Sequence, residues 1–480
     1  MQRKHSTAGV IFLSTHTTEK IIAKEQKQLL KLKKKQAKGN YKLYFAVILF
    51  LIAFVNIIDE VSSGLPSYVQ SSIVTDFLVN SKFLGKSYSF QEGLSLHTTI
   101  GALSYVFGVV TPFYKALADK FGRKPLFAFS TFGMSLGMFV AFLSNNYIMF
   151  LIGYSIMGFF MGHDIQIIYV LEEAPTKLRA RIYSVLKTLG ILGTVAIPAL
   201  RDLLMQNDPE RWRLVFLVPA LVGFIACGLV IAFAKDTKVF INERIAYLSI
   251  PYEERQELKK LKKEEAKADT KKQGVFNGIK YIFSNKDTRL LIISHMVFDV
   301  AIASVGLFYE SIMHLAGLST QQTTDALYMI PFVYSGVTLL SGFVADYIGR
   351  KKTVLIGSVM CVGCFVLFIL GLNKGFAPYL IGIFAGLYQS GYWIGRDYMN
   401  IMMTEKVPTE IRASVVGGEG LLVTVGMALG YVLMIVGMEL TTVANACLVI
   451  IVPCVSIAAI IMMLKVKETK GTELDEIKSL

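Results

Sequence analysis

Apolar runs of about 18 or more residues recur along the whole chain, and their length constrains the fold more than any other feature. A helix of that length crosses the hydrocarbon core of a membrane, about 30 Å thick, in one pass. The strands of a membrane barrel would instead alternate polar and apolar residues over about ten positions. Because 54% of the residues are hydrophobic and only 18% are charged, the sequence predicts an all-α membrane protein that is not an enzyme.

The apolar runs form two sets of six, so we expect twelve transmembrane helices. The first set is expected at 42–66, 96–117, 126–143, 147–170, 182–205 and 213–234. The second set is expected at 289–314, 326–346, 353–372, 377–400, 412–436 and 441–464. The regions they define are a basic cytoplasmic N-terminal tail (1–41), an N-terminal six-helix bundle (42–234), a charged cytoplasmic linker (235–288), a C-terminal six-helix bundle (289–464) and a cytoplasmic C-terminal tail (465–480). One long external loop is expected at 67–95.

The net charge of +14 is gathered in blocks, with lysine-rich stretches in the N-terminal tail and in the linker. Basic residues favour loops on the cytoplasmic side of a membrane, so this charge does not indicate nucleic-acid binding. Both termini are therefore expected in the cytoplasm, and the protein is expected in the plasma membrane as a monomer in contact with lipid. The polar tail ahead of the first run is unlike a cleaved signal peptide, so that span should stay in the mature protein.

The cysteines and the short motifs indicate no cofactor. All five cysteines lie inside apolar runs, so no extracellular disulfide framework is implied. Cys361 and Cys364 form a C-x-x-C spacing, for which helix packing is a better interpretation than a metal or redox site. The chain has no G-x-x-x-x-G-K-[ST] loop, so ATP-driven transport is not supported. We expect neither a metal nor a cofactor.

The two halves repeat each other at equivalent places. The loops after the second and eighth spans share a D-x-x-G-R-K pattern, and the segments after the fourth and tenth spans share E-x-x-P-x-x-x-R. Glycine permits a tight turn, while Asp and Arg can form charge-assisted bonds that hold adjacent helices together. The residues that these gating motifs supply are Asp119, Gly122, Arg123, Lys124, Glu172 and Arg179 in the first half, and Asp346, Gly349, Arg350, Lys351, Glu405 and Arg412 in the second.

Paired loops of this kind resemble the signature loop of the major facilitator superfamily, and the resemblance covers nearly the whole chain. It implies two six-helix repeats with a solute site between them near the middle of the bilayer. The tail Glu468-Thr469-Lys470-Gly471 resembles that of the sugar-porter branch and its organic-ion relatives, and Asp236-Thr237-Lys238 is a degenerate echo after the sixth span. One departure is that the glycine four residues before the loop Asp is kept as Gly342 but is Lys115 in the first half.

At the positions where sugar porters bind their solute, the sequence departs from the branch. By alignment with the branch, Lys187 replaces a glutamine of the fifth helix, and Arg396, Asp397 and Asn400 fall in its tenth-helix tryptophan motif. Asp299 falls near a seventh-helix glutamine. Sugars are recognised by neutral amides and aromatic groups, so these charges argue against a plain hexose carrier.

Ionisable groups within spans are costly and usually face a cavity, so they are the candidate site residues. The candidates for substrate binding or coupling are Asp59, Glu60, His163, Asp164, Lys187, Asp299, Glu310, Trp393, Arg396, Asp397, Asn400 and Glu419. Asp299 and Glu310 are close to three helical turns apart, so we expect them to share the cavity face of the seventh helix. Packing bonds between helices and an internal ion pair that only stabilises a bundle remain alternatives for these charges.

The sequence therefore predicts a secondary active transporter of a small charged or zwitterionic organic solute, with proton coupling through a buried acid. A sugar or polyol carrier with an altered pocket is the alternative within the same class. A membrane sensor that uses the same scaffold without transporting a solute is a third interpretation.

Overall fold

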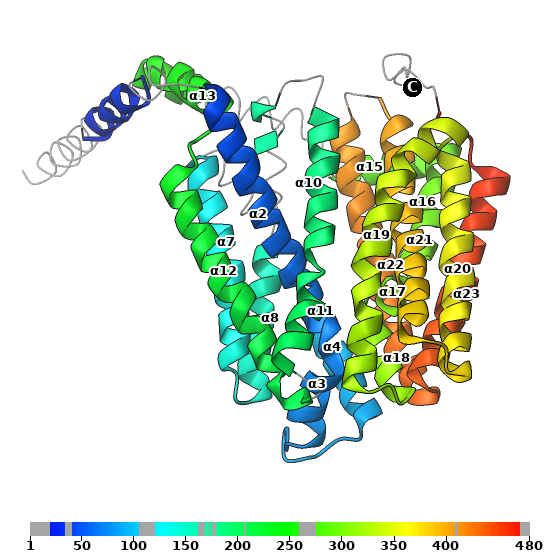
Figure 1. The fold of residues 1–480 in the computed structure, drawn as a ribbon. Coiled ribbons are helices and arrows are strands. Elements are labelled where there is room, and N and C mark those ends of the chain that lie inside the picture. Colours follow the sequence, from blue (N-terminus) through cyan, green and yellow to red (C-terminus); the bar gives the residue numbers. More distant parts are fainter. Residues whose placement is uncertain are drawn as a thin grey trace, which may run out of the picture.

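The computed structural model describes residues 20–33, 41–104, 121–161, 169–170, 172–174, 179–205, 208–258, 275–408 and 411–470. Within these residues the regular structure is helical, apart from an isolated bridge between Phe83 and Lys86. The all-α prediction is confirmed. The helices stand side by side in two groups, one on the left and one on the right of Figure 1.

The left-hand group holds the first half of the chain. Short helical segments continue some of its long helices at the bottom of the view. Its elements are α2 (Tyr41–Tyr68), α3 (Gln70–Val74), the π-helix η1 (Thr75–Val79), α4 (Phe90–Ser104), α7 (Arg123–Leu143), α8 (Tyr147–Met161), α10 (Arg179–Gly193), α11 (Ala196–Leu200), the π-helix η2 (Arg201–Met205), the 3-10 helix η3 (Pro209–Arg211) and α12 (Trp212–Phe233). The helix α13 (Lys238–Ser249) follows and lies beside the top of this group.

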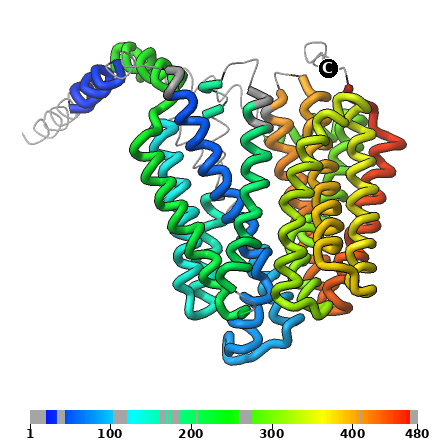
Figure 2. Tube along the Cα trace, viewed as in Figure 1, coloured from blue at the N-terminus to red at the C-terminus, as the bar shows by residue number. Residues whose placement is uncertain are grey.

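The right-hand group holds the second half of the chain, and Figure 2 traces it from green to red. Its elements are α15 (Val275–Ser284), α16 (Lys286–Asp299), α17 (Ile302–Gly306), α18 (Tyr309–Leu315), α19 (Thr320–Ile348), α20 (Arg350–Lys374), α21 (Pro378–Glu405), α22 (Arg412–Leu440) and α23 (Val443–Lys465). We call the end with α13 and the C-terminus the linker end, and the opposite end, with the segment between η1 and α4, the loop end.

Eight of the described helical segments are long and apolar enough to cross a membrane. The other four predicted spans correspond to α4, α8, the series α16 to α18, and α21. Two details of the sequence-based spans are wrong. The first helix continues through α3 and η1 to Val79, so the loop expected at 67–95 is shorter, and the fifth and seventh spans are interrupted rather than continuous.

Glycines let the central helices of each group pack closely. A Cβ added at Gly137 of α7 would lie 2.8 Å from the carbonyl oxygen of Gly153 on α8. A Cβ at Gly357 of α20 would lie 2.7 Å from the carbonyl oxygen of Gly391 on α21. Close backbone approach through small residues is a common way for helices to associate in lipid, because it maximises van der Waals contact. The corresponding helix pairs of the two repeats therefore use the same packing device.

The glycines of the two D-x-x-G-R-K loops have similar backbone angles. Gly122 and Gly349 adopt positive φ angles of 106° and 97°, which glycine tolerates best. A Cβ at Gly122 would lie 2.5 Å from Oδ1 of Asp236, and one at Gly349 would lie 2.6 Å from Oε2 of Glu468. Glycine is therefore required at both places by the backbone angle and by the carboxylate that packs against it.

The arginine of each loop pairs with the glutamate of the second motif in the same half. Nη2 of Arg123 lies 2.7 Å from Glu172, and Nε of Arg350 lies 3.3 Å from Glu405. Thr237 donates to the first of these glutamates, and Thr469 donates to the second. These bonds join segments within one half, so each group of helices is tied together at the linker end as a separate unit.

The segments 236–238 and 468–470 complete the repeat, although the sequence relates them only weakly. Asp236 accepts a hydrogen bond from the backbone N–H of Lys124 at 3.1 Å. Glu468 likewise accepts from the N–H groups of Arg350 and Lys351, at 3.0 and 3.1 Å. Each acid thus binds the exposed N-terminus of the helix that follows the loop, where the helix dipole favours negative charge.

The other predicted gating residues have different outcomes. Asp346 accepts from Arg350 at 3.1 Å, one turn away on an exposed surface. Arg412 donates to a backbone carbonyl five residues earlier in the chain. Asp119 lies outside the described residues, as does the side chain of Arg179.

The Glu468 contact makes the linker end sensitive to pH. Partial burial opposes ionisation of this carboxyl, but the N–H groups of Thr469, Lys470, Lys351 and Arg350 donate to it, and together they hold its pKa below the ordinary value. A carboxylate whose pKa is lowered on folding stabilises the native state at neutral pH. That stabilisation is lost as the pH falls through the lowered pKa.

We therefore expect Glu468→Gln to lower the melting temperature of the purified protein by about 2 °C at pH 7, as loss of a helix cap does. The difference from the unmodified protein should begin to shrink as the pH falls below about 4.3, the ordinary pKa of glutamate, and should vanish only below the lowered pKa, where the natural carboxyl is protonated too. The matched control is Glu439→Gln, which changes an exposed carboxylate at the C-terminal end of α22, far from Glu468 in sequence. A difference that stays constant with pH would contradict the assignment.

Candidate functional site

A buried ion pair lies at the centre of the second half. Nε of Arg396 on α21 lies 2.9 Å from Oδ2 and 3.1 Å from Oδ1 of Asp299 on α16. The hydroxyl of Tyr392 donates to Oδ1 of the same carboxylate at 2.8 Å. Asp299 is fully buried, whereas the Arg396 side chain is 19% exposed. The carboxylate of Asp299 therefore fixes the position of the Arg396 guanidinium. Of the two side chains, only that of Arg396 is partly exposed and can contact a bound molecule.

Close packing of α16 against α21 brings the pair together. A Cβ at Gly395 would lie 2.6 Å from the Phe298 ring, so the absence of a side chain there lets the helices approach beside the ion pair. The rings of Phe298 and Tyr392 stack with their centroids 5.0 Å apart. Trp393 lies on the other side of Arg396, whose guanidinium carbon is 5.4 Å from the indole ring. These rings fix the position of the charged groups.

A second carboxylate joins this group through a histidine. Nδ1 of His295 lies 3.1 Å from Oε1 of Glu419 on α22, and Nε2 of the same ring lies 4.0 Å from Asp299. All three side chains are buried. We call His295, Asp299, Tyr392, Arg396 and Glu419 the buried cluster. It joins three helices of the second half by bonds that alternate between acid and base.

A further charged pair connects the two halves directly. Nζ of Lys187 on α10 lies 3.4 Å from Oδ2 of Asp397 on α21, and both side chains are more than a third exposed. Glu60 on α2 interacts electrostatically with Lys187. Tyr334 on α19 interacts with Glu60, Asp397 and Arg396. Two residues that are adjacent in sequence therefore have different partners. Arg396 belongs to the buried cluster, whereas Asp397 pairs with Lys187 of the other half.

Four further predicted residues lie on α2 and α21 or outside the described part of the chain. Asp59 is partly buried on α2, and Asn400 is partly buried on α21, one turn beyond Arg396. His163 and Asp164 lie outside the described residues. Among the residues that the structure describes, no group of histidine, cysteine, aspartate and glutamate side chains has the arrangement of a metal site.

The expectation that Asp299 and Glu310 share one helix face is wrong. It assumed a continuous seventh span, whereas α16 ends at Asp299 and Glu310 belongs to the separate helix α18. Glu310 is buried near the loop end and pairs with Arg201, whose Nη1 lies 3.5 Å from its Oε1. The two acids therefore have different partners on different helices.

Several contributors were missed although one rule could have found them. His97 and Arg201 are ionisable residues inside predicted spans, so the rule that identified Lys187 applies equally to them. Tyr334 carries no such signal, because an aromatic residue in an apolar run is ordinary.

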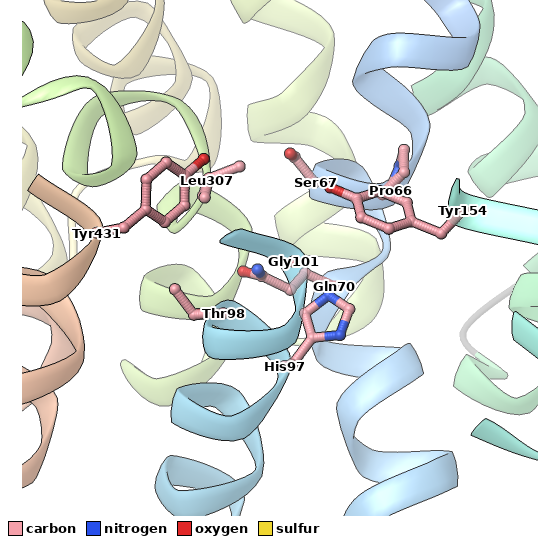
Figure 3. Close-up of a pocket in the computed structure, with 9 residues that line it drawn as sticks. All are labelled: Pro66, Ser67, Gln70, His97, Thr98, Gly101, Tyr154, Leu307 and Tyr431. Atoms are coloured by element: carbon pink, nitrogen blue, oxygen red, sulfur yellow. The ribbon is translucent and has the colours of Figure 1, made fainter. Parts of the chain in front are cut away.

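A small pocket lies where the two halves approach each other, and Figure 3 shows the residues that each half contributes to its lining. Ser67 and Gln70 reach it from the end of α2 and the start of α3, His97 from α4, and Tyr431 from α22. Nδ1 of His97 is bonded to the hydroxyl of Tyr147 at 2.9 Å, and in Figure 3 the His97 ring points toward Gln70. We call this the central pocket. Its polar groups are uncharged side chains that can donate or accept hydrogen bonds.

Solved structures with the same fold are transporters. The xylose transporter XylE of E. coli, in a partially occluded inward-open conformation, matches with a TM-score of 0.63 at 14% identity, over 90% of this chain and 100% of that one. The nucleoside transporter NupG matches with a TM-score of 0.62 at 16% identity, over 88% and 100% of the two chains. These likenesses confirm the twelve-helix fold.

Curated relatives are more similar in sequence. Organic cation/carnitine transporter 6 of Arabidopsis thaliana is 25% identical over 353 residues, 69% of this chain and 65% of that protein. The chain therefore spans slightly less than two thirds of that relative. The minor myo-inositol transporter IolF of Bacillus subtilis is 27% identical over 372 residues, 75% of this chain and 79% of that one.

Residues 49–431 match the sequence profile of the Major Facilitator Superfamily. This range extends over most of both helical groups, and the repeated loops, the packing of equivalent helices and the fold of the solved relatives agree with it. Members of this family are integral membrane transporters of small molecules and are not enzymes. The chain belongs to the Major Facilitator Superfamily.

Proposed function

We propose that the protein is a secondary active transporter of a small charged or zwitterionic organic solute, which works by alternating access and is coupled to protons. The observation that supports it most is the row of Lys187, Arg396 and Asp397 between the two halves, with both signs of charge partly exposed. Exposed charges of both signs suit a solute with both signs of charge. Arg396 can bind a carboxylate, and Asp397 and Glu60 can bind a cationic group.

The orientation follows from charge and from contacts. The basic N-terminal tail and linker favour a cytoplasmic linker end, and hence cytoplasmic termini in a plasma-membrane protein. The bonds between the halves that surround Glu310 lie near the loop end, which faces outward in this orientation. The structure then corresponds to a state that is closed to the outside. The tail lysines suit contact with anionic lipid, and we propose a monomer.

The buried cluster suits proton coupling because its charge balances only when it holds one extra proton. Arg396 neutralises Asp299, which leaves Glu419 and a neutral His295 with a single negative charge. One proton on Glu419 removes that charge, and an unbalanced charge in this buried place is costly. With the proton bound, Arg396 attracts a solute carboxylate more strongly. Proton and solute therefore bind together and leave together.

A sugar or polyol carrier is the second candidate, and the central pocket favours it. The serine, glutamine, histidine and tyrosine side chains that line the pocket match hydroxyl groups, and relatives include transporters named for myo-inositol and glucose. Uptake into proteoliposomes under a pH gradient separates the candidates. We propose carnitine and myo-inositol as the two probes, because one is a zwitterion and the other is neutral.

We expect Lys187→Gln to raise the KM for carnitine about tenfold, since it alters the charge row that recognises the solute, and to leave any myo-inositol uptake unchanged. Lys374→Gln, at the exposed end of α20, is the matched control and should change neither. Saturable myo-inositol uptake that carnitine does not inhibit would refute the proposal and support the polyol carrier.

We expect Glu419→Gln to abolish carnitine accumulation driven by a pH gradient and to spare exchange of carnitine for carnitine. Glutamine fixes the cluster in its neutral state, which binds solute but cannot release the proton. Asp299→Asn should impair both modes, because it leaves Arg396 without its counter-charge. Glu439→Gln on the same helix is the control, and gradient-driven accumulation that survives Glu419→Gln would remove this carboxylate from the coupling mechanism.

A further inference from the structure

A second buried ion pair joins the two halves near the loop end. Arg201, from η2 of the first half, lies 3.5 Å from Glu310, from α18 of the second half, and each side chain is only 2% exposed. Arg201 also donates to the backbone carbonyl of Tyr68 and, from Nε, to the hydroxyl of Thr324 at 3.2 Å. Its guanidinium thus has partners on α2, α18 and α19.

Hydrogen bonds from uncharged residues surround the pair and also cross between the halves. The backbone N–H of Ser71 donates to Oε2 of Glu310 at 2.8 Å, and the hydroxyl of Ser71 donates to Oε1. The residues next to these two also form a bond, since the hydroxyl of Ser311 donates to the side-chain oxygen of Gln70 at 2.7 Å. We call Gln70, Ser71, Arg201, Glu310 and Ser311 the loop-end seal. The seal is polar throughout, so water can replace its bonds when the halves part.

Polar pockets lie on both sides of this seal. On the linker side is the central pocket, to which Ser67 and Gln70 contribute. On the loop side is a second pocket, lined in part by Ser72, Thr75, Arg201, Glu310, His314 and Thr323. Because the chain runs toward the loop end through α2, α3 and η1, successive turns of one continuous segment pass from the first pocket to the second.

We propose that Arg201 and Glu310 form the gate between these two pockets. Breaking their bond joins the pockets into one polar passage from the loop end to the central pocket. This inference rests on the alternating access proposed above, but it does not depend on which solute is carried or on proton coupling.

The energetic argument concerns the balance of the two states. While closed, the pair is almost fully buried, and its charges are balanced by each other and by the hydrogen bonds around them. Removing one partner leaves the other buried and uncompensated, which opposes closure. Opening the passage hydrates the remaining charge and relieves that penalty. Neutralising either residue should therefore shift the population toward the state that is open at the loop end.

Labelling of cysteines on the two sides of the protein tests the gate. Thr98→Cys reports from the central pocket, where Thr98 is 3% exposed. Asn400→Cys reports from the linker half of α21, and Thr320→Cys reports from the loop-side pocket, on the outer side of the proposed gate. A membrane-impermeant maleimide is applied from each side of the reconstituted protein, and labelling of the protein without added cysteines is subtracted.

We expect Glu310→Gln and Arg201→Gln each to raise the labelling rate of Thr98→Cys from the loop side about tenfold. Labelling of Asn400→Cys from the linker side should fall, and that of Thr320→Cys should stay constant. The double variant Arg201→Gln and Glu310→Gln should change labelling less than the sum of the two single effects, because it leaves no unpaired charge. Ser311→Ala, which removes a neutral bond of the same seal, should change it least.

Each result decides the matter. Unchanged labelling of Thr98→Cys in both single variants would overturn the gate, and so would single effects that add fully in the double variant. Faster labelling of both Thr98→Cys and Asn400→Cys would show loosened packing instead, which also overturns it. The expected reciprocal change, together with no uptake of carnitine or myo-inositol, would support the gate while refuting the proposed substrates.

Discussion

The pairing of buried charges is the constraint on which the rest of this structure depends. Helices in lipid satisfy their own backbone groups, but a charged side chain among them needs a partner from another helix. Asp299 obtains Arg396 from α21, and Glu310 obtains Arg201 from the other half of the chain. These pairs fix which helix faces meet. They also concentrate free energy in a few contacts that a change of state must break or preserve.

Some ion pairs join residues within one half of the chain, and others join one half to the other. At the linker end, Arg123 pairs with Glu172 and Arg350 with Glu405, each within its own half. Such bonds can persist while the halves move, so each half can behave as a rigid body. Arg201 with Glu310, and Lys187 with Asp397, join one half to the other. Rocking of two rigid units must act on the pairs of this second kind.

The sequence predicted the spans and their repeat well, because both depend on patterns along the chain. Apolar length identifies a helix, and the two D-x-x-G-R-K loops identify equivalent corners. Interruptions of the seventh span were missed because the residues between Asp299 and Tyr309, where α16, α17 and α18 are separated, are small or apolar and include no proline. Partners were also missed, since nothing local links Glu419 to His295 or Glu310 to Arg201. Which charges pair depends on how helices distant in sequence pack together. The identity of a single residue does not reveal that packing.

The seal and the buried cluster pose different physical problems, which explains their different composition. The seal needs bonds that water can replace, and an ion pair with serine and glutamine neighbours meets that need because each group is well hydrated when exposed. The cluster lies within the second half alone, so under the proposed mechanism its charge is balanced by a proton rather than by water. An unsatisfied Nε2 on His295 lies beside Asp299 within it. The imidazole ring therefore stands between the two acids of the cluster, with Nδ1 toward Glu419 and Nε2 toward Asp299.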